Sequence, residues 1–250
     1  MQPSGPPERP GIVHTRAFTL VELLIVLLII GILASMLLPA LAKARDKARQ
    51  VRCLNSARAM GLGIELFAAD NHDRLLPHGI HGPPPADALV PNDRVTFWPD
   101  LLRPYLPDVR VLDCPCHHGI SDKPVVEMGL SVGALGPYAC EAHPLNWLPR
   151  ARIACPAETL FIGDVDFITP ASAAYANADL WRPDAGTKAT AFSLRTPGDP
   201  HYASVLTRLV NRHLGRSTVG FADGHAESVP ASRMGFHLPL GRRGSLWDRY

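Results

Sequence analysis

Residues 16–42 of the chain, RAFTLVELLIVLLIIGILASMLLPALA, decide the fold. From Phe18 to Ala42 the only ionisable side chain is that of Glu22. About 20 apolar residues, at about 1.5 Å each, cross the hydrocarbon core of a bilayer, so this run is long enough to be a transmembrane helix. A carboxylate in such a run is costly in lipid, which predicts a specific role and a defined partner for Glu22.

The stretch Phe18-Thr-Leu-Val-Glu22-Leu-Leu follows Ala17 and a leader with basic residues. It resembles the N-terminal cleavage and methylation motif of type IV prepilins and type II secretion pseudopilins. The resemblance implies that a prepilin peptidase cuts between Ala17 and Phe18 and methylates the new amino group of Phe18. It also implies that Glu22 pairs with the N-terminus of a neighbouring subunit in a filament. The family usually has glycine before the cut. A small alanine at position 17 still fits there, so we expect processing.

Two other interpretations of the apolar run stay open. A secretory signal peptide has an apolar region of about 7–15 residues followed by a small-residue cleavage site, whereas this run is longer and has no clear A-x-A site. A plain signal anchor with no filament role is the second alternative. Against it stands the position of Glu22 within FTLVELL, a combination that is difficult to obtain by chance.

Composition limits the rest of the chain. At 250 residues it can hold one membrane helix and one modest globular domain. The formal net charge of +2 gives no reason to propose nucleic acid as a partner. The chain contains 20 Gly and 25 Pro, which together are 18% of its 250 residues. The average share is about 12%, so the globular part is expected to be rich in loops.

The orientation in the membrane has two conflicting signals. Positive residues near a membrane helix usually mark its cytoplasmic side. The leader has Arg9 and Arg16, and the opposite flank has more: Lys43, Arg45, Lys47, Arg49, Arg52 and Arg58. Charge counting therefore places the C-terminal domain in the cytoplasm. The resemblance implies an extracytoplasmic domain instead, and we favour it because the leader must face the cytoplasm to meet the peptidase.

The helix is expected to continue past the membrane, over residues 43–70. Apolar residues recur there at steps of three and four and form one stripe: Leu41, Ala44, Ala48, Val51, Leu54, Ala57, Met60, Ile64 and Phe67. Proline lacks the amide hydrogen of a helical residue and clashes with the preceding turn. Pro39 therefore predicts a kink, or, in the alternative interpretation, the end of the membrane segment.

The fold class expected for the chain is α+β, with this long helix packed on a small, loop-rich antiparallel sheet, as in pilins. We divide the chain into a cleaved leader (1–17), a transmembrane helix (18–42), its amphipathic continuation (43–70), a globular domain (71–230) and a surface tail (231–250). Within the domain, 71–100 is expected to be loop, 101–106 a helical turn, 111–115 a short strand, 159–163 a strand and 171–200 an irregular insertion. Residues 217–222 and 225–229 are expected to form a hairpin, with Asp223-Gly224 as a type I′ turn.

His213 is followed by nine residues and then by Asp223-Gly224. This H-x9-DG pattern resembles the C-terminal signature of a large group of pseudopilin-like proteins, and Cys114-Pro115 and the stretch PAETLFIGD at 156–164 add to the resemblance. Asp164, Asp166, His213 and Asp223 are weak candidates for a metal site, with calcium as the ion that carboxylates favour. The simpler interpretation is that Asp223 shapes the turn and that His213 bonds to nearby backbone.

The five cysteines are Cys53, Cys114, Cys116, Cys140 and Cys155. In an oxidising periplasm disulfides are the favoured state, and five cysteines allow two bridges with one thiol left over. The pairing cannot be deduced from sequence, although a bridge from Cys53 to Cys114 or Cys116 would fasten the helix to the domain. Unpaired thiols and a metal site around Cys114-Pro-Cys116-His117-His118 are the alternatives.

The sequence contains no G-x-S-x-G, H-E-x-x-H or P-loop motif, so we expect a structural subunit rather than an enzyme. The resemblance implies a subunit of a pseudopilus or pilus-like filament, possessing one span in the inner membrane. The implied partners are other pilin or pseudopilin subunits, the prepilin peptidase, the assembly platform and membrane lipid. The alternative is a membrane-tethered periplasmic binding or metal-dependent module that uses a prepilin-type signal.

Overall fold

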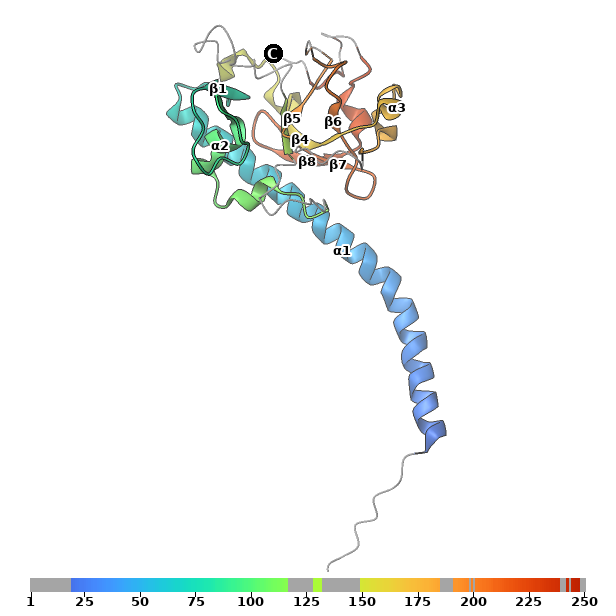
Figure 1. The fold of residues 1–250 in the computed structure, drawn as a ribbon. Coiled ribbons are helices and arrows are strands. Elements are labelled where there is room, and N and C mark those ends of the chain that lie inside the picture. Colours follow the sequence, from blue (N-terminus) through green and yellow to red (C-terminus); the bar gives the residue numbers. More distant parts are fainter. Residues whose placement is uncertain are drawn as a thin grey trace, which may run out of the picture. The chain divides into compact units, whose positions relative to one another are not determined.

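The computed structural model describes residues 19–116, 128–131 (backbone), 149–184, 191–197, 199, 201–238, 242 and 244–247. The chain divides into two compact units, residues 1–44 and 45–250. One long helix, α1 (Leu20–Asp70), begins in the first unit and ends in the second (Figure 1).

The first unit consists, in its described part, of the apolar half of α1. Its side chains are exposed, including those of Leu24, Leu27 and Ile30. Within the described ranges, α1 alone is long and apolar enough to cross a membrane by length and composition. Helix α1 is continuous through Pro39. The alternative that the membrane segment ends at Pro39 stays a prediction. A kink at this proline stays a prediction.

The second unit contains a six-stranded sheet. Its strands are β3 (Met128–Ser131), β4 (Leu160–Phe167), β5 (Ser193–Leu194), β6 (Thr207–Leu209), β7 (Ser217–Phe221) and β8 (Ala226–Val229). The order is β5-β3-β4-β7-β8, with β6 also paired to β4. Every pairing is antiparallel except that of β3 with β5. The α+β class predicted from the sequence is therefore confirmed.

Smaller elements surround this sheet. A two-stranded ribbon is formed by β1 (Gly79–His81) and β2 (Val95–Phe97), and short helices are α2 (Trp98–Leu102) and α3 (Pro170–Ala173). Single 3₁₀ turns are η1 (Arg103–Tyr105), η2 (Val109–Leu112), η3 (Arg150–Arg152), η4 (Pro156–Glu158), η5 (Ala178–Leu180) and η6 (Ala231–Met234).

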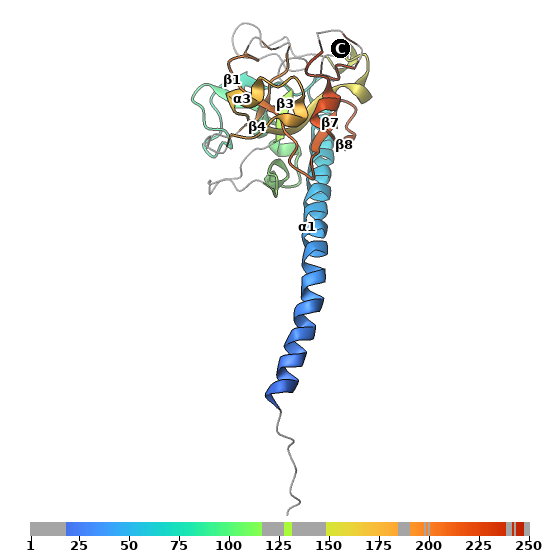
Figure 2. The same cartoon turned by 90° about the vertical axis from the view of Figure 1, so that its right-hand side faces the viewer.

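The second half of α1 packs beside the sheet, as both views of the ribbon show (Figures 1 and 2). The predicted apolar stripe is right from Ala57 onwards, since Ala57, Met60, Ile64 and Phe67 are buried. It is wrong about two turns earlier, where Ala48 and Val51 are exposed and Gln50 and Cys53 are buried instead. The amide of Gln50 is accommodated because its Nε2 donates to Oγ of Ser228 on β8 at 2.7 Å.

Both faces of the sheet are covered. One hydrophobic core includes Met60 of α1, Trp98 of α2 and Phe161 of β4. A second core includes Val165 of β4 and Trp247 near the C-terminus. Strand β4 thus contributes to both cores, which explains why its first six residues are all buried.

Several local predictions need correction. Residues 71–100 contain β1 and β2 as well as loop, 111–115 begin in the 3₁₀ turn η2 rather than a strand, and the strand predicted at 159–163 extends to Phe167. The segment 171–200 includes the short elements η5 and β5. The C-terminal residues are not a surface tail, because Trp247 is 1% exposed and Met234 is fully buried.

The hairpin of β7 and β8 is present where it was predicted, but its turn is of a different type. A type I′ turn needs positive φ at both central residues, and here only Gly224 has it, at 86°. The amide of Gly224 donates to the carbonyl of Phe221 at 3.0 Å. This is the three-residue hairpin loop in which a left-handed glycine follows a type I turn.

Candidate functional site

The N-terminal motif begins, in its described part, with a reciprocal cap of α1. The amide and the hydroxyl of Thr19 both donate to Oε2 of Glu22, at 2.9 and 2.7 Å. The amide of Glu22 donates to the hydroxyl oxygen of Thr19 at 3.2 Å. This arrangement is a capping box, which satisfies amide hydrogens that the first helical turn leaves unpaired. Ala17 and Phe18, the predicted processing residues, lie outside the described residues.

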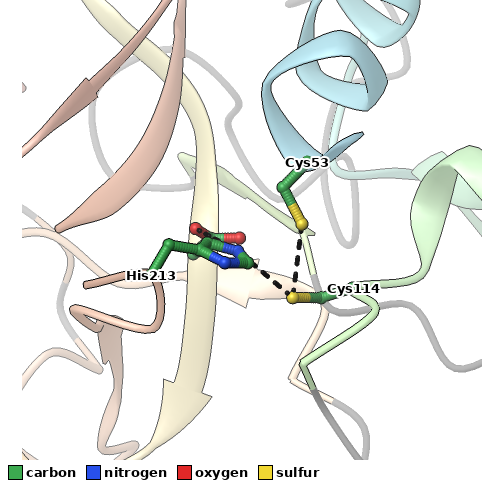
Figure 3. Close-up of side chains that lie close together, drawn as sticks. Cys53, Cys114 and His213 are labelled. Carbon is green, nitrogen blue, oxygen red and sulfur yellow. Dashed lines mark hydrogen bonds and ion pairs between the residues drawn. The ribbon is translucent and has the colours of Figure 1, made fainter. Parts of the chain in front are cut away.

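A second group of candidate residues lies in the folded domain. Cys53, Cys114, Asp164 and His213 come from four separate segments: α1, the chain after η2, β4 and the turn before β7. Each offers one ligand-type atom, and these atoms all lie within 4.8 Å of one another. Figure 3 shows Cys53, Cys114 and His213 pointing toward a common centre. We call these four residues the buried cluster.

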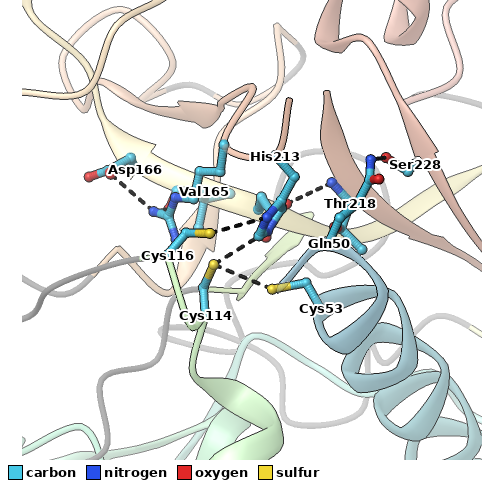
Figure 4. Close-up of polar contacts among 11 residues, drawn as sticks. Gln50, Cys53, Cys114, Cys116, Val165, Asp166, His213, Thr218 and Ser228 are labelled. Atoms are coloured by element: carbon cyan, nitrogen blue, oxygen red, sulfur yellow. Dashed lines mark hydrogen bonds and ion pairs between the residues drawn. The ribbon is translucent and has the colours of Figure 1, made fainter. Parts of the chain in front are cut away.

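The distances inside the buried cluster are short. Sγ of Cys53 lies 3.3 Å from Sγ of Cys114, and Sγ of Cys114 lies 3.4 Å from Nε2 of His213. The same Nε2 lies 3.7 Å from Oδ2 of Asp164. On the other edge of the ring, Nδ1 of His213 lies 3.4 Å from Sγ of Cys116 (Figure 4). One imidazole therefore contacts both cysteines of the Cys114-Pro-Cys116 sequence.

The buried cluster is closed to solvent. The exposed fraction is 0% for Asp164, 1% for Cys53 and Cys114, and 2% for His213. The amide of Thr218 donates to Oδ2 of Asp164 at 2.6 Å, but Oδ1 has no hydrogen-bond partner among the described residues. A buried carboxylate with an unsatisfied oxygen is unfavourable unless a further positive group compensates it.

The ionisation of these groups reflects their burial and proximity. Burial, together with the adjacent Cys114 sulfur, raises the pKa of Asp164 to about 6. The hydrogen bond from Cys53 lowers the pKa of Cys114 and correspondingly raises that of Cys53. Burial thus disfavours the negative charge of Asp164 unless a cation lies beside it.

Arg212 is a permanent cation whose charge acts on Asp164 and Cys114 of the cluster. Its Nη2 donates to the carbonyl of Val165 and lies 3.0 Å from Oδ2 of Asp166. Burial acts to lower the pKa of Arg212, but the charges of Asp164 and Cys114 outweigh it and raise that pKa. The guanidinium therefore supports the anionic side of the cluster while it pairs with Asp166.

The structure does not bring together all four metal candidates predicted from the sequence. Asp164 and His213 lie in the buried cluster, and Asp166 contacts it only through Arg212. Asp223 lies in the hairpin turn, where Oδ1 accepts the amide of His225 at 3.1 Å and lies 2.5 Å from its Nδ1. Asp223 therefore shapes the turn, as the simpler interpretation expected. The interpretation of His213 as a group bonded to nearby backbone misses its sulfur contacts.

Cys53 and Cys114 lie close together in space, as a bridge between them would require. Cys53 and Cys114 are adjacent, but a covalent S–S bond is about 2.05 Å long, shorter than the 3.3 Å observed. Cys155 belongs to the start of η4 and is not a member of the buried cluster. Cys140, His117 and His118 lie outside the described residues. A disulfide therefore stays a prediction.

Comparison with known proteins supports the N-terminal interpretation. The family described as the prokaryotic N-terminal methylation motif matches residues 14–38, which include Ala17, Phe18 and Glu22. No curated protein and no solved structure matches the chain. The motif implies a prepilin-like protein that is processed by prepilin peptidase. With the apolar helix it indicates membrane anchoring and an extracytoplasmic domain.

Proposed function

We propose that this prepilin-like protein is a structural subunit of a pseudopilus or pilus-like filament, of the kind that serves type II secretion. The methylation motif at the start of α1 carries the proposal. From Leu20 to Leu41, helix α1 presents exposed apolar side chains on every face. Such a surface is stable only in lipid or against other helices, so the same segment suits the membrane before assembly and a filament core after it.

The contacts of Glu22 suggest how assembly selects its register. Within one chain its carboxylate is held by Thr19 at the helix start. In a filament core of low dielectric, a carboxylate without a cationic partner is strongly unfavourable. Cleavage before Phe18 would create such a cation, the methylated amino group. We propose that Glu22 of one subunit pairs with the amino group of Phe18 on the next.

Substitution of Glu22 tests this proposal. Glu22→Ala is expected to insert in the membrane and to be cleaved normally, but to be lost from the sheared filament fraction. Thr19→Ala is the matched control, because it removes the cap, at a cost of about 1 kcal/mol, and keeps the carboxylate. Thr19→Ala filaments should form. Normal filaments from Glu22→Ala would disprove the role of Glu22.

The alternative is a membrane-tethered binding or metal-dependent module, and the buried cluster is the observation that favours it. A module that exchanges a ligand needs access from solvent, however, whereas Asp164 and His213 are 0% and 2% exposed. The cluster therefore fits a structural centre within a filament subunit better than a binding site. Recovery of the processed wild-type chain only as membrane monomers would favour the module.

A further inference from the structure

We propose that the buried cluster of Cys53, Cys114, Asp164 and His213 is a structural site for one Zn²⁺ ion. The inference goes beyond the filament role and does not depend on it. All four residues belong to the unit formed by residues 45–250.

The spacing of the four ligand atoms fits a tetrahedral ion. Zinc bonds of about 2.3 Å to sulfur and about 2.0–2.2 Å to nitrogen and oxygen give ligand separations of about 3.8 Å for S···S, 3.6 Å for S···N and 3.4 Å for N···O. The corresponding separations are 3.3 Å for Cys53 and Cys114, 3.4 Å for Cys114 and His213, and 3.7 Å for His213 and Asp164. These three separations differ from the tetrahedral values by a few tenths of an ångström, and the other three pairs of ligand atoms lie within 4.8 Å of each other.

The groups around the cluster orient its ligands. Metal-binding histidines usually give their other ring nitrogen to an acceptor, which fixes the tautomer. Here Nδ1 of His213 lies 3.4 Å from Sγ of Cys116, which leaves Nε2 directed at Cys114 and Asp164. The Thr218 amide holds Oδ2 of Asp164 at 2.6 Å. Cys116 is therefore an orienting residue in this proposal rather than a ligand.

The ligand types select zinc among biological cations. Two thiolates and one imidazole suit a borderline-soft ion in tetrahedral geometry, whereas calcium takes six to eight oxygen ligands. The calcium option considered from the sequence thus does not fit Asp164 and His213. Four protein ligands leave no open position, which is typical of structural rather than catalytic zinc.

A disulfide between Cys53 and Cys114 is the competing interpretation. It would account for the two adjacent sulfurs, but not for the buried carboxylate and imidazole that converge on them. A metal ion accounts for all four side chains at once.

The site would connect parts of the domain that are distant in sequence. Cys53 and Cys114 are 61 positions apart, and Cys114 and His213 are 99 apart. An ion bound by all four would fasten α1 to the sheet and to the segment after η2. Because such a site does not exist in the unfolded chain, zinc binding would contribute directly to folding stability.

Metal analysis of the full-length chain, purified in detergent without chelator, tests the proposal. We expect one zinc ion per chain and a thermal transition that falls when a strong chelator removes it. Replacement by Co²⁺ should give thiolate-to-cobalt charge-transfer absorption and tetrahedral ligand-field bands. Cys53→Ser and Asp164→Asn should lose zinc and these bands. Cys155→Ser, which lies outside the cluster, should keep both.

Measurements on the wild type keep the proposal testable even if a cluster variant fails to fold. Peptide mapping should find Cys53 and Cys114 as thiols after zinc removal. Folded wild-type protein that contains no zinc and binds none when Zn²⁺ is added would overturn the proposal. So would a Cys53–Cys114 disulfide in the purified chain. Neither result would affect the filament role.

Discussion

A Cβ atom built on Gly61 of α1 would lie 2.8 Å from the carbonyl oxygen of Gly224, in the turn between β7 and β8. The helix thus approaches the hairpin through two glycines, at a distance that real Cβ atoms do not tolerate against backbone. Gly224 has a φ of 86°, a left-handed backbone conformation that favours glycine at this position. The neighbouring side chain of Leu62, by contrast, is 63% exposed.

Gly61→Ala is therefore expected to destabilise the domain although alanine favours helix. Overpacking against backbone typically costs about 1–3 kcal/mol, more than the roughly 1 kcal/mol gained in helix propensity. The matched control is Leu62→Ala on the same helical turn, which should change little. Thermal unfolding of the detergent-solubilised chain measures both. Equal stability of the two variants would show that the helix can move away from the turn.

The ion pair of Arg195 and Asp199 is expected to matter much more than an exposed one. Their atoms Nη1 and Oδ2 lie 2.6 Å apart, and the side chains are 5% and 3% exposed. Removal of one partner of a buried pair costs about 3–5 kcal/mol because the other charge stays buried. Asp199→Ala should lower the free energy of unfolding by that order.

The exposed pair of Arg103 and Asp87 supplies the control, with 37% and 69% of the side chains exposed. Solvent screens such a pair, so Asp87→Ala should leave the unfolding midpoint almost unchanged. Chemical denaturation of the two variants under one set of conditions makes the comparison. A small effect of Asp199→Ala, similar to that of Asp87→Ala, would contradict the importance of burial here.

Acid is expected to weaken the domain through His78. Burial, with a contribution from the charge of Arg195, lowers the pKa of His78 to about 3. Below pH 6.5 the unfolded chain therefore binds a proton that the folded chain does not, and stability is lost as the pH falls from 6.5 toward 3. Between pH 7 and pH 5 the loss from this residue is about 2 kcal/mol.

His78→Phe isolates this effect. The ring of His78 lies among aromatic side chains, 5.4 Å from that of Phe192 in a stacked arrangement, so phenylalanine preserves most of the packing. It also leaves Oγ of Ser193 without the contact that Nε2 makes at 2.6 Å, but that cost does not vary with pH. The variant should lose less stability between pH 7 and pH 5 than the wild type. Parallel stability curves for the two chains would refute the assignment.

Local patterns allowed part of this fold to be predicted from the sequence. The long apolar run, the helical spacing from Ala57 to Phe67 and the alternation around Asp223-Gly224 each depend on neighbours in the chain. The helix face at Gln50 could not be predicted from apolar spacing, because the side chain buried there is polar. Its burial depends on Ser228, which is 178 positions away. The burial of Trp247 could not be predicted either, because this residue belongs to no periodic segment of the sequence.

The buried cluster could be predicted from the sequence only as two unconnected pairs of residues. Asp164 and His213 were metal candidates together with Asp166 and Asp223, whereas Cys53 and Cys114 were candidates for a disulfide. The fold instead brings Cys53, Cys114, Asp164 and His213 together from four elements. Arg212 and Thr218 carried no recognisable motif, and their roles became evident only from their contacts. Side-chain chemistry identified the candidates, and tertiary packing determined which of them meet.

Mass spectrometry of the N-terminus, on protein purified from its native membranes, is the most direct test of the filament account. The account predicts a chain that begins at N-methylated Phe18, because the methylation motif matches residues 14–38. An intact Met1, or a cut beyond the apolar run, would contradict it and would identify the segment as an ordinary anchor or signal.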